Sequence, residues 1–116
     1  MEIKKYLNRI LNQDNIINIL PDKKVYFLHA NHPTPPYIEY EIIDEYGDGY
    51  SENKEISTHY IVQIDIFSYS DYTEIEKIIY DSMIEAGFSR DKGADLYEED
   101  TKYNHKAMRF NISLPK

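Results

Sequence analysis

Histidine is the residue type in this chain best suited to hold a metal ion, and it occurs at His29, His32, His59 and His105. A zinc site needs three or four ligands that converge on one point, such as two histidines one helical turn apart with a carboxylate nearby. None of these histidines sits four residues from another on an expected helix with a carboxylate nearby, and no H-E-x-x-H pattern occurs. His29 and His32 with acidic partners are an alternative zinc pair, but the pattern favours surface histidines, and we predict no metal site.

Acidic residues gather at Asp44-Glu45, at Asp48 and at Glu98-Glu99-Asp100. Paired carboxylates act in acid–base catalysis or bind Mg²⁺ when they are buried and close together. These carboxylates fall at the ends of expected strands and in expected loops, where charge is ordinarily solvated. The chain also has no cysteine, no G-x-G-x-x-G or P-loop pattern and no G-x-S-x-G motif. We therefore predict no catalytic residue, no cofactor and no enzymatic activity.

The charge balance argues against a protein that binds nucleic acid tightly. Thirteen Lys and Arg residues stand against 21 Asp and Glu, which gives a net charge of −8. Tight binding to DNA or RNA needs a basic stripe that neutralises phosphates, whereas the only adjacent basic residues are Lys4-Lys5 and Lys23-Lys24. An acidic surface suits instead a protein past which DNA slides without sticking.

The sequence has no feature of a membrane or secreted protein. No apolar run approaches the ~20 residues that span a bilayer, and the opening "MEIKKYLNRILNQDN" is too charged for a signal-peptide core. The lack of cysteine agrees with a reducing compartment. We expect a cytoplasmic protein without a membrane partner, folded as one domain over residues 1–116.

Helical periodicity opens the chain, because the apolar residues between Ile3 and Leu11 lie on one stripe of an amphipathic helix. Three strands are expected next, at Lys24–Ala30, Tyr37–Tyr46 and Tyr60–Ser68. The prolines of "NHPTPP" separate the first two strands. The segment "GDGYSENKE" (47–55) is expected to be a polar, mobile connector, longer than a tight hairpin turn.

In the third expected strand, Val62, Ile64 and Ile66 point to one face, whereas Gln63 and Asp65 point to the other. This alternation is typical of an antiparallel sheet with one buried face and one wetter face. We therefore expect the helices to pack on the side of Val62.

A second helix follows this strand, with Ser70 or Asp71 as its N-cap and Gly87 as its C-cap. A polar loop then leads to a short strand at "DLYEED" (95–100) and to a last strand at "KYNHKAMRFNISL" (102–114). Hairpin-linked strands with helices on one side define an α+β fold. We predict an antiparallel or mixed sheet of four to five strands with two helices packed on it, in the order α-β-β-β-α-β.

Tyrosine is frequent, with 12 residues against no tryptophan. Six of these tyrosines fall at the ends of expected elements or in loops: Tyr46, Tyr50, Tyr69, Tyr72, Tyr97 and Tyr103. Tyrosine is enriched at protein–protein interfaces, so this group indicates an interaction surface. Nucleotide bias in a low-GC genome is the alternative explanation.

Several stretches of the chain resemble, in order, one family of bacteriophage proteins. "HPTPPYIEYEI" is similar to a proline-rich loop that leads into a "PYI" strand, and "YIVQIDIFS" through "IEKIIYDSMIEAGF" is similar to a strand and a helix that end in Gly-Phe. "DLYEEDTKYNHKAMRFNISL" resembles the closing segment of tail-terminator, or head–tail joining, proteins of long-tailed bacteriophages and prophages. The resemblance covers most of the chain, and its motifs are structural rather than catalytic.

The resemblance implies a structural protein whose copies form a hexameric ring that caps the finished tail tube and joins it to the head connector. Its partners would be further copies of itself, the tail tube protein and the head connector protein, with DNA only passing through the channel. Its place would be the cytoplasm of the bacterial host during assembly and then the head–tail junction of the virion. A closed ring requires one face of each subunit to meet a different face of its neighbour.

Two sets of residues are candidates for these contacts. The first lies in the segment 45–55 and comprises Glu45, Tyr46, Asp48, Tyr50, Glu52 and Lys54. The second comprises Tyr103, His105 and Arg109, which are expected to share the exposed face of the last strand. The alternative from another class is a small α+β binding or regulatory module of host or prophage origin, dimeric through its sheet edges.

Overall fold

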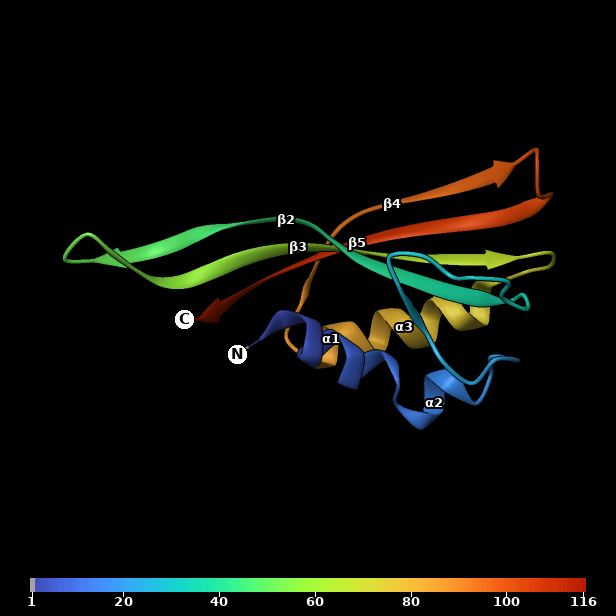
Figure 1. The fold of residues 1–116 in the computed structure, drawn as a ribbon, viewed down its shortest axis with the longest axis horizontal. Coiled ribbons are helices and arrows are strands. Elements are labelled where there is room, and N and C mark those ends of the chain that lie inside the picture. Colours follow the sequence, from blue (N-terminus) through green and yellow to red (C-terminus); the bar gives the residue numbers. More distant parts are fainter. Residues whose placement is uncertain (1) are drawn as a thin grey trace.

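The structure is a computed structural model that describes residues 2–116. In this range five strands form one mixed sheet in the order β1-β2-β3-β5-β4, and three helices lie along one of its faces (Figure 1). The elements are α1 (Ile3–Leu11), α2 (Asp14–Ile17), β1 (Tyr26–Phe27), β2 (Tyr37–Ser51), β3 (Lys54–Ser68), α3 (Thr73–Glu85), β4 (Ser89–Glu98) and β5 (Tyr103–Pro115). The α+β prediction is confirmed, and the short helix α2 is an addition to it.

Helix α1 has the bounds that its sequence predicts. Glu2 is its N-cap, because the Glu2 carboxylate accepts hydrogen bonds from the backbone N–H groups of Lys4 (2.8 Å) and Lys5 (3.3 Å). The apolar stripe of the helix is buried in the core: Ile3, Leu7, Ile10 and Leu11. The stripe therefore fixes which side of the helix faces the sheet.

Helix α3 is closed at both ends by local hydrogen bonds. The N-cap is Tyr72, so the prediction of Ser70 or Asp71 at this position is wrong. Asp71 lies one residue earlier, and its Oδ1 accepts from the backbone N–H (3.0 Å) and the hydroxyl (2.6 Å) of Thr73. At the other end the Phe88 N–H donates to the Met83 carbonyl, which together with the positive φ of +102° at Gly87 makes a Schellman cap. The predicted capping role of Gly87 is confirmed.

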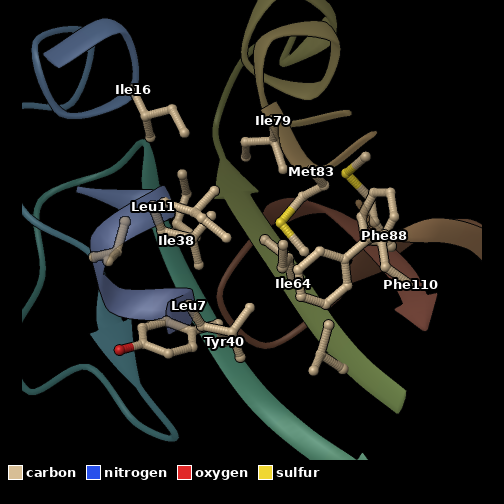
Figure 2. Close-up of a cluster of buried hydrophobic side chains, with 14 of the residues drawn as sticks. Leu7, Leu11, Ile16, Ile38, Tyr40, Ile64, Ile79, Met83, Phe88 and Phe110 are labelled. Carbon is tan, nitrogen blue, oxygen red and sulfur yellow. The ribbon is translucent and has the colours of Figure 1, made fainter. Parts of the chain in front are cut away.

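The core lies between the helices and the sheet (Figure 2). Ile38, Ile64 and Phe110 from the strands pack with Leu7 from α1 and Ile79 from α3, and all five are fully shielded from solvent. Burying one side chain of this size contributes roughly 1.5–3 kcal/mol. The alternating apolar residues of β3 and β5 thus form the inner layer that their sequence predicts.

Strands β2 and β3 form a much longer hairpin than expected. The prediction of a mobile connector at 47–55 is wrong, because β2 and β3 remain paired as far as Ser51 and Lys54. Glu52 and Asn53 complete the hairpin, and both have positive φ angles, 52° and 65°. Two consecutive positive φ angles define a type I′ turn, whose twist suits a two-residue hairpin loop. The polar segment is therefore an ordered ribbon.

The two strands at the sheet edges also differ from prediction. Strand β4 begins at Ser89, within the segment expected to be a loop, because its polar residues form a backbone ladder with β5 that needs no burial of side chains. A bulge interrupts that ladder between Arg90 and Gly93. Strand β1 is only two residues long, since Leu28 takes a left-handed backbone conformation (φ 69°) directly after it.

The outer half of the β2–β3 hairpin projects beyond the helices, and we call this half, Ile43–Ile61, the arm (Figure 1). A bulge between Ile42 and Asp44 marks its base on β2. Strand β5 flanks the arm as far as the pair Ser57–Pro115. The arm makes the molecule elongated, with extents of 52 × 29 × 24 Å.

Candidate assembly surface

Several large side chains of the arm are half exposed or more. The exposed fraction is 50% for Tyr46, 66% for Tyr50 and 53% for Ile56. The arm also carries five acidic residues against the single basic residue Lys54: Asp44, Glu45, Asp48, Glu52 and Glu55. It therefore combines aromatic surface with negative charge, and such aromatic groups are enriched where proteins bind one another.

Polar contacts on the flanking strand β5 hold the base of the arm in place. Asp48 Oδ2 accepts a hydrogen bond from the Ser113 hydroxyl (2.5 Å), and Ser113 Oγ lies 2.8 Å from His59 Nδ1. The ring of His59 packs against that of Tyr46, with 5.1 Å between the ring centres. These contacts tie both strands of the arm to the end of the chain.

A second set of contacts fixes the outer part of the arm. Glu55 accepts hydrogen bonds from Lys116 Nζ (2.9 Å) and from the Thr58 hydroxyl (2.9 Å). These two bonds, that from Lys116 first, lower the pKa of the Glu55 carboxyl below its usual value. The arm therefore holds a defined shape although little of it is buried.

The first set of predicted contact residues comes together on the arm, and all of its members are exposed: Glu45, Tyr46, Asp48, Tyr50, Glu52 and Lys54. Glu52 lies in the turn, and Lys54 is the first residue of β3. Since the segment is a ribbon and not a loop, these side chains occupy fixed positions along paired strands.

The second predicted set, Tyr103, His105 and Arg109, shares the face of β5 that points away from the helices, but it is only partly exposed. His105 Nε2 lies 2.7 Å from Asp65 Oδ1, and His105 Nδ1 lies 3.3 Å from Glu98 Oε2. The exposed fraction of the His105 side chain is 13%. The expectation of a fully exposed face is wrong, because neighbouring side chains of β3 and β4 enclose this histidine.

Hydrogen bonds continue from His105 across the sheet. Gln63 Nε2 donates to Asp65 Oδ1 (2.9 Å), and Arg109 Nε donates to Gln63 Oε1 (2.8 Å). The Asp65 hydrogen bond is the main cause that raises the pKa of His105, and burial raises the pKa of the nearby Glu41 carboxyl. Arg109 and His105 thus belong to an internal polar network.

Asp65 is more deeply buried than the sequence pattern predicts. Alternation along β3 puts it on the wetter face, yet it is only 5% exposed. The face is partly covered by a small aromatic cluster in which Phe67 stacks on both Tyr37 (4.8 Å) and His105 (4.3 Å). Alternation predicts the side of a strand, but not whether large neighbours shield that side.

Tyr103 belongs to this aromatic cluster. Its ring packs against Phe67 (6.0 Å) and stacks on Tyr69 (4.7 Å), whose own exposed fraction is 63%. Tyr69 is one of the six tyrosines that the sequence suggests for an interface. It lies far along the sheet from the arm, at the end of β3.

Sequence reasoning missed a basic cleft between α3 and strands β4 and β5. Its volume is about 260 Å³, and its lining includes Lys77, Arg90, Lys92, Lys106 and Arg109. These five are drawn from only 13 Lys and Arg residues in the whole chain. We call this feature the basic cleft. No local sequence pattern predicts this cleft, because its side chains come from three separate elements.

The described part of the chain, residues 2–116, has no group of three His, Asp or Glu side chains placed to hold a metal ion. Within the same range no helix has the length and apolar character needed to cross a bilayer.

Comparison with known protein families finds no matching family model, and comparison with curated proteins finds no matching protein. The geometry therefore defines an α+β protein with a projecting acidic β-ribbon and a basic cleft.

Proposed function

We propose that this protein is a structural component of a long-tailed bacteriophage or prophage and acts where the tail meets the head. Its copies form a ring, with six as the expected number, that closes the tail tube and joins it to the head connector. It works without catalysis and without a cofactor. The observation that carries this proposal is the arm Ile43–Ile61, an ordered ribbon that extends beyond the core (Figure 1).

The arm favours assembly because a single chain gains little stability from forming it. A two-stranded ribbon gains little stability alone, and exposed strand edges with apolar side chains invite association. Tyr46, Tyr50 and Ile56 remain half exposed or more. A ring requires each subunit to offer two unlike faces, and the arm supplies one of them.

The charge of the chain agrees with the same role. A net charge of −8 repels phosphate, so DNA that moves through a ring of such subunits is not retained. The proposed partners are other copies, the tail tube protein and the head connector protein. DNA is cargo in the channel and is not bound specifically.

A second candidate function is a dimeric binding or regulatory module. It is favoured by the outer edge of β4, which lies at the end of the sheet and has no neighbouring strand among the described residues. Two such edges related by a two-fold axis pair as antiparallel strands and form one continuous sheet.

Native mass spectrometry over a concentration series, with and without Mg²⁺, separates the two candidates. The ring predicts a hexamer and, by negative-stain electron microscopy, a particle with a central channel. A tight dimer at every concentration would favour the module instead. A ligand that raises the Tm of such a dimer would strengthen that reading.

A shortened arm tests whether the arm makes the contact. Asp48–Ser57 is replaced by Asn-Gly, so that a type I′ turn joins the paired residues Gly47 and Thr58. We expect the helical circular dichroism signal to be retained and the hexamer to be lost. Arg109 is left intact in this variant, since it donates to Gln63 inside the fold. A shortened chain that still forms hexamers would contradict the role of the arm.

A further inference from the structure

Two cations of the basic cleft have no ion-pair partner among residues 2–116. Arg90 and Lys92 are exposed, and neither forms an ion pair within residues 2–116. Lys106, deeper in the cleft, lies 3.3 Å from Asp95 and 3.6 Å from Glu76. The rim of the cleft therefore offers two free positive charges on a protein that is otherwise strongly acidic.

The floor of the cleft is apolar. It includes Tyr80, Met108 and Phe110, of which Phe110 is fully buried and Tyr80 is 36% exposed. Gly93 contributes no side chain at the edge of the cleft, next to the bulge in β4. A basic rim around an apolar floor fits a ligand that joins an aromatic group to negative charge.

The arm has this composition. Tyr50 is its most exposed aromatic residue, at 66%. Glu52 lies two residues further on, in the turn at the tip, and its carboxylate has no ion-pair partner in the described chain. The tip of the arm thus complements the basic cleft in both charge and aromatic character.

A chain cannot place its own arm in its own cleft. The arm is paired with β3 and flanked by β5, and it points away from the helices (Figure 1). The cleft is bordered by α3, on the helical side of the sheet. The complementary surface must therefore come from another molecule.

We propose that, in solution, the tip of the arm of one copy docks into the basic cleft of the next copy. Tyr50 packs on the apolar floor, and Glu52 faces Arg90 and Lys92. The contact joins two different surfaces, so each subunit contributes its arm to one neighbour and its cleft to the other, as a closed ring requires. This inference rests on the proposed ring and names the two faces that build it.

Charge reversal provides the test, because a heterologous contact can be broken on either side and repaired between two chains. The arm variant is E52K, and the cleft variant is R90E/K92E. All three side chains are exposed and make no ion pair within the described chain, so both variants should fold. The controls for changed net charge are E99K for the arm variant and K5E/K102E for the cleft variant, at exposed positions outside both surfaces.

We expect each variant alone to weaken assembly roughly tenfold or more, as like charges meet at the contact. Native mass spectrometry and sedimentation velocity measure this. An equal mixture of the two variants should restore the assembly, since each arm then meets a cleft of opposite charge. The restored ring alternates the two chains and therefore needs an even number of subunits, which six satisfies.

Cross-linking gives a second readout. The chain has no cysteine, so the variant Y50C/K92C introduces the only two thiols. We expect oxidation to produce a ladder of covalent oligomers, whereas Y50C or K92C alone should produce at most dimers. A ladder that is absent although the oligomer is present would overturn the arm–cleft contact.

The outcomes separate this contact from the proposed function. If wild type forms a hexamer and neither charge variant changes it, the contact is wrong while the ring stands. If both variants dissociate but their mixture does not reassemble, the contact is also wrong. If phosphate raises the Tm of wild type but not of R90E/K92E, and assembly is unaffected, the cleft is an anion site. A wild-type chain that stays monomeric at every concentration excludes the contact in solution.

Discussion

Strands β2 and β3 pass through two different environments along their length. In the half that lies under the helices, Ile38, Ile64 and Ile66 are fully buried. In the half that forms the arm, Tyr46 and Tyr50 are at least half exposed, although the same two strands continue in register beyond a single bulge. One hairpin thus serves as both core and projection.

The difference separates what holds the fold from what is available for binding. The inner half is stabilised by apolar burial between sheet and helices. The arm relies on its backbone ladder and on a few polar contacts, such as those of Asp48 with Ser113 and of Glu55 with Lys116. Arm side chains therefore contribute little to folding, and changes there should act on assembly instead.

The largest expected effect tests this division directly. Phe110→Ala removes a fully buried ring from the core, and we expect the free energy of unfolding to fall by about 3–5 kcal/mol. Tyr50→Ala on the arm should change it by less than about 0.5 kcal/mol. Urea denaturation followed by circular dichroism, at a protein concentration where both variants are monomeric, measures the two values. A similar loss for both variants would show that the arm is part of the stabilising core.

Two glycines with positive φ allow the stability of the body and of the arm to be compared by variants with an intermediate expected effect. Gly87 (φ +102°) caps α3, and a Cβ there would lie 3.7 Å from Ile112, so only backbone strain opposes Gly87→Ala. We expect a loss of about 1–2 kcal/mol in the free energy of unfolding. Gly49 (φ +79°) lies in the arm, where Gly49→Ala should loosen the ribbon locally and cost less globally.

Hydrogen exchange distinguishes these two outcomes. For Gly49→Ala, faster exchange should be confined to amides of the arm, because the ribbon opens without unfolding the core. For Gly87→Ala, protection should fall throughout the core. Faster exchange in the core of the Gly49 variant would mean that arm and body unfold together.

The two halves also differ in how far the sequence predicts them. The alternation of Val62, Ile64 and Ile66 identifies the buried half, because one face of that strand meets the helices. The arm has no apolar alternation, since neither of its faces is covered. Its turn, Glu52–Asn53, also lacks the Asn-Gly or Asp-Gly pair that marks a type I′ hairpin. Pairing of polar strands through the backbone leaves no periodic signal in the sequence.

The basic cleft was beyond prediction for a different reason. Lys77 lies on α3, Arg90 and Lys92 lie on β4, and Lys106 lies on β5. These positions come together only when β4 pairs with β5 beside the helix. The segment that begins β4 is expected to be a loop from its composition, so its cations have no expected place in the fold.

The smallest expected effect concerns the side of the sheet without helices. Hydrogen bonding to Asp65 raises the pKa of His105 in the folded protein. The charged imidazole is therefore favoured by folding, and its contribution to stability is fully present below about pH 6.5, the unfolded value. That contribution is lost as the pH rises through the raised pKa. Glu98 and Glu41 also face this region, and burial raises the pKa of the Glu41 carboxyl.

We expect the free energy of unfolding to decline as the pH rises from about 6 to 8, by less than the cost of Gly87→Ala. The decline is small because neutral His105 still donates from Nε2 to Asp65, so only the charge is lost. Urea titrations at several pH values should show a flatter profile for His105→Gln. The matched control is His29→Gln, at an exposed position without a side-chain hydrogen bond in residues 2–116. If His105→Gln keeps the slope of wild type, protonation of His105 is not coupled to folding through the polar network. This face of the sheet would then affect the stability of the core as little as the arm does.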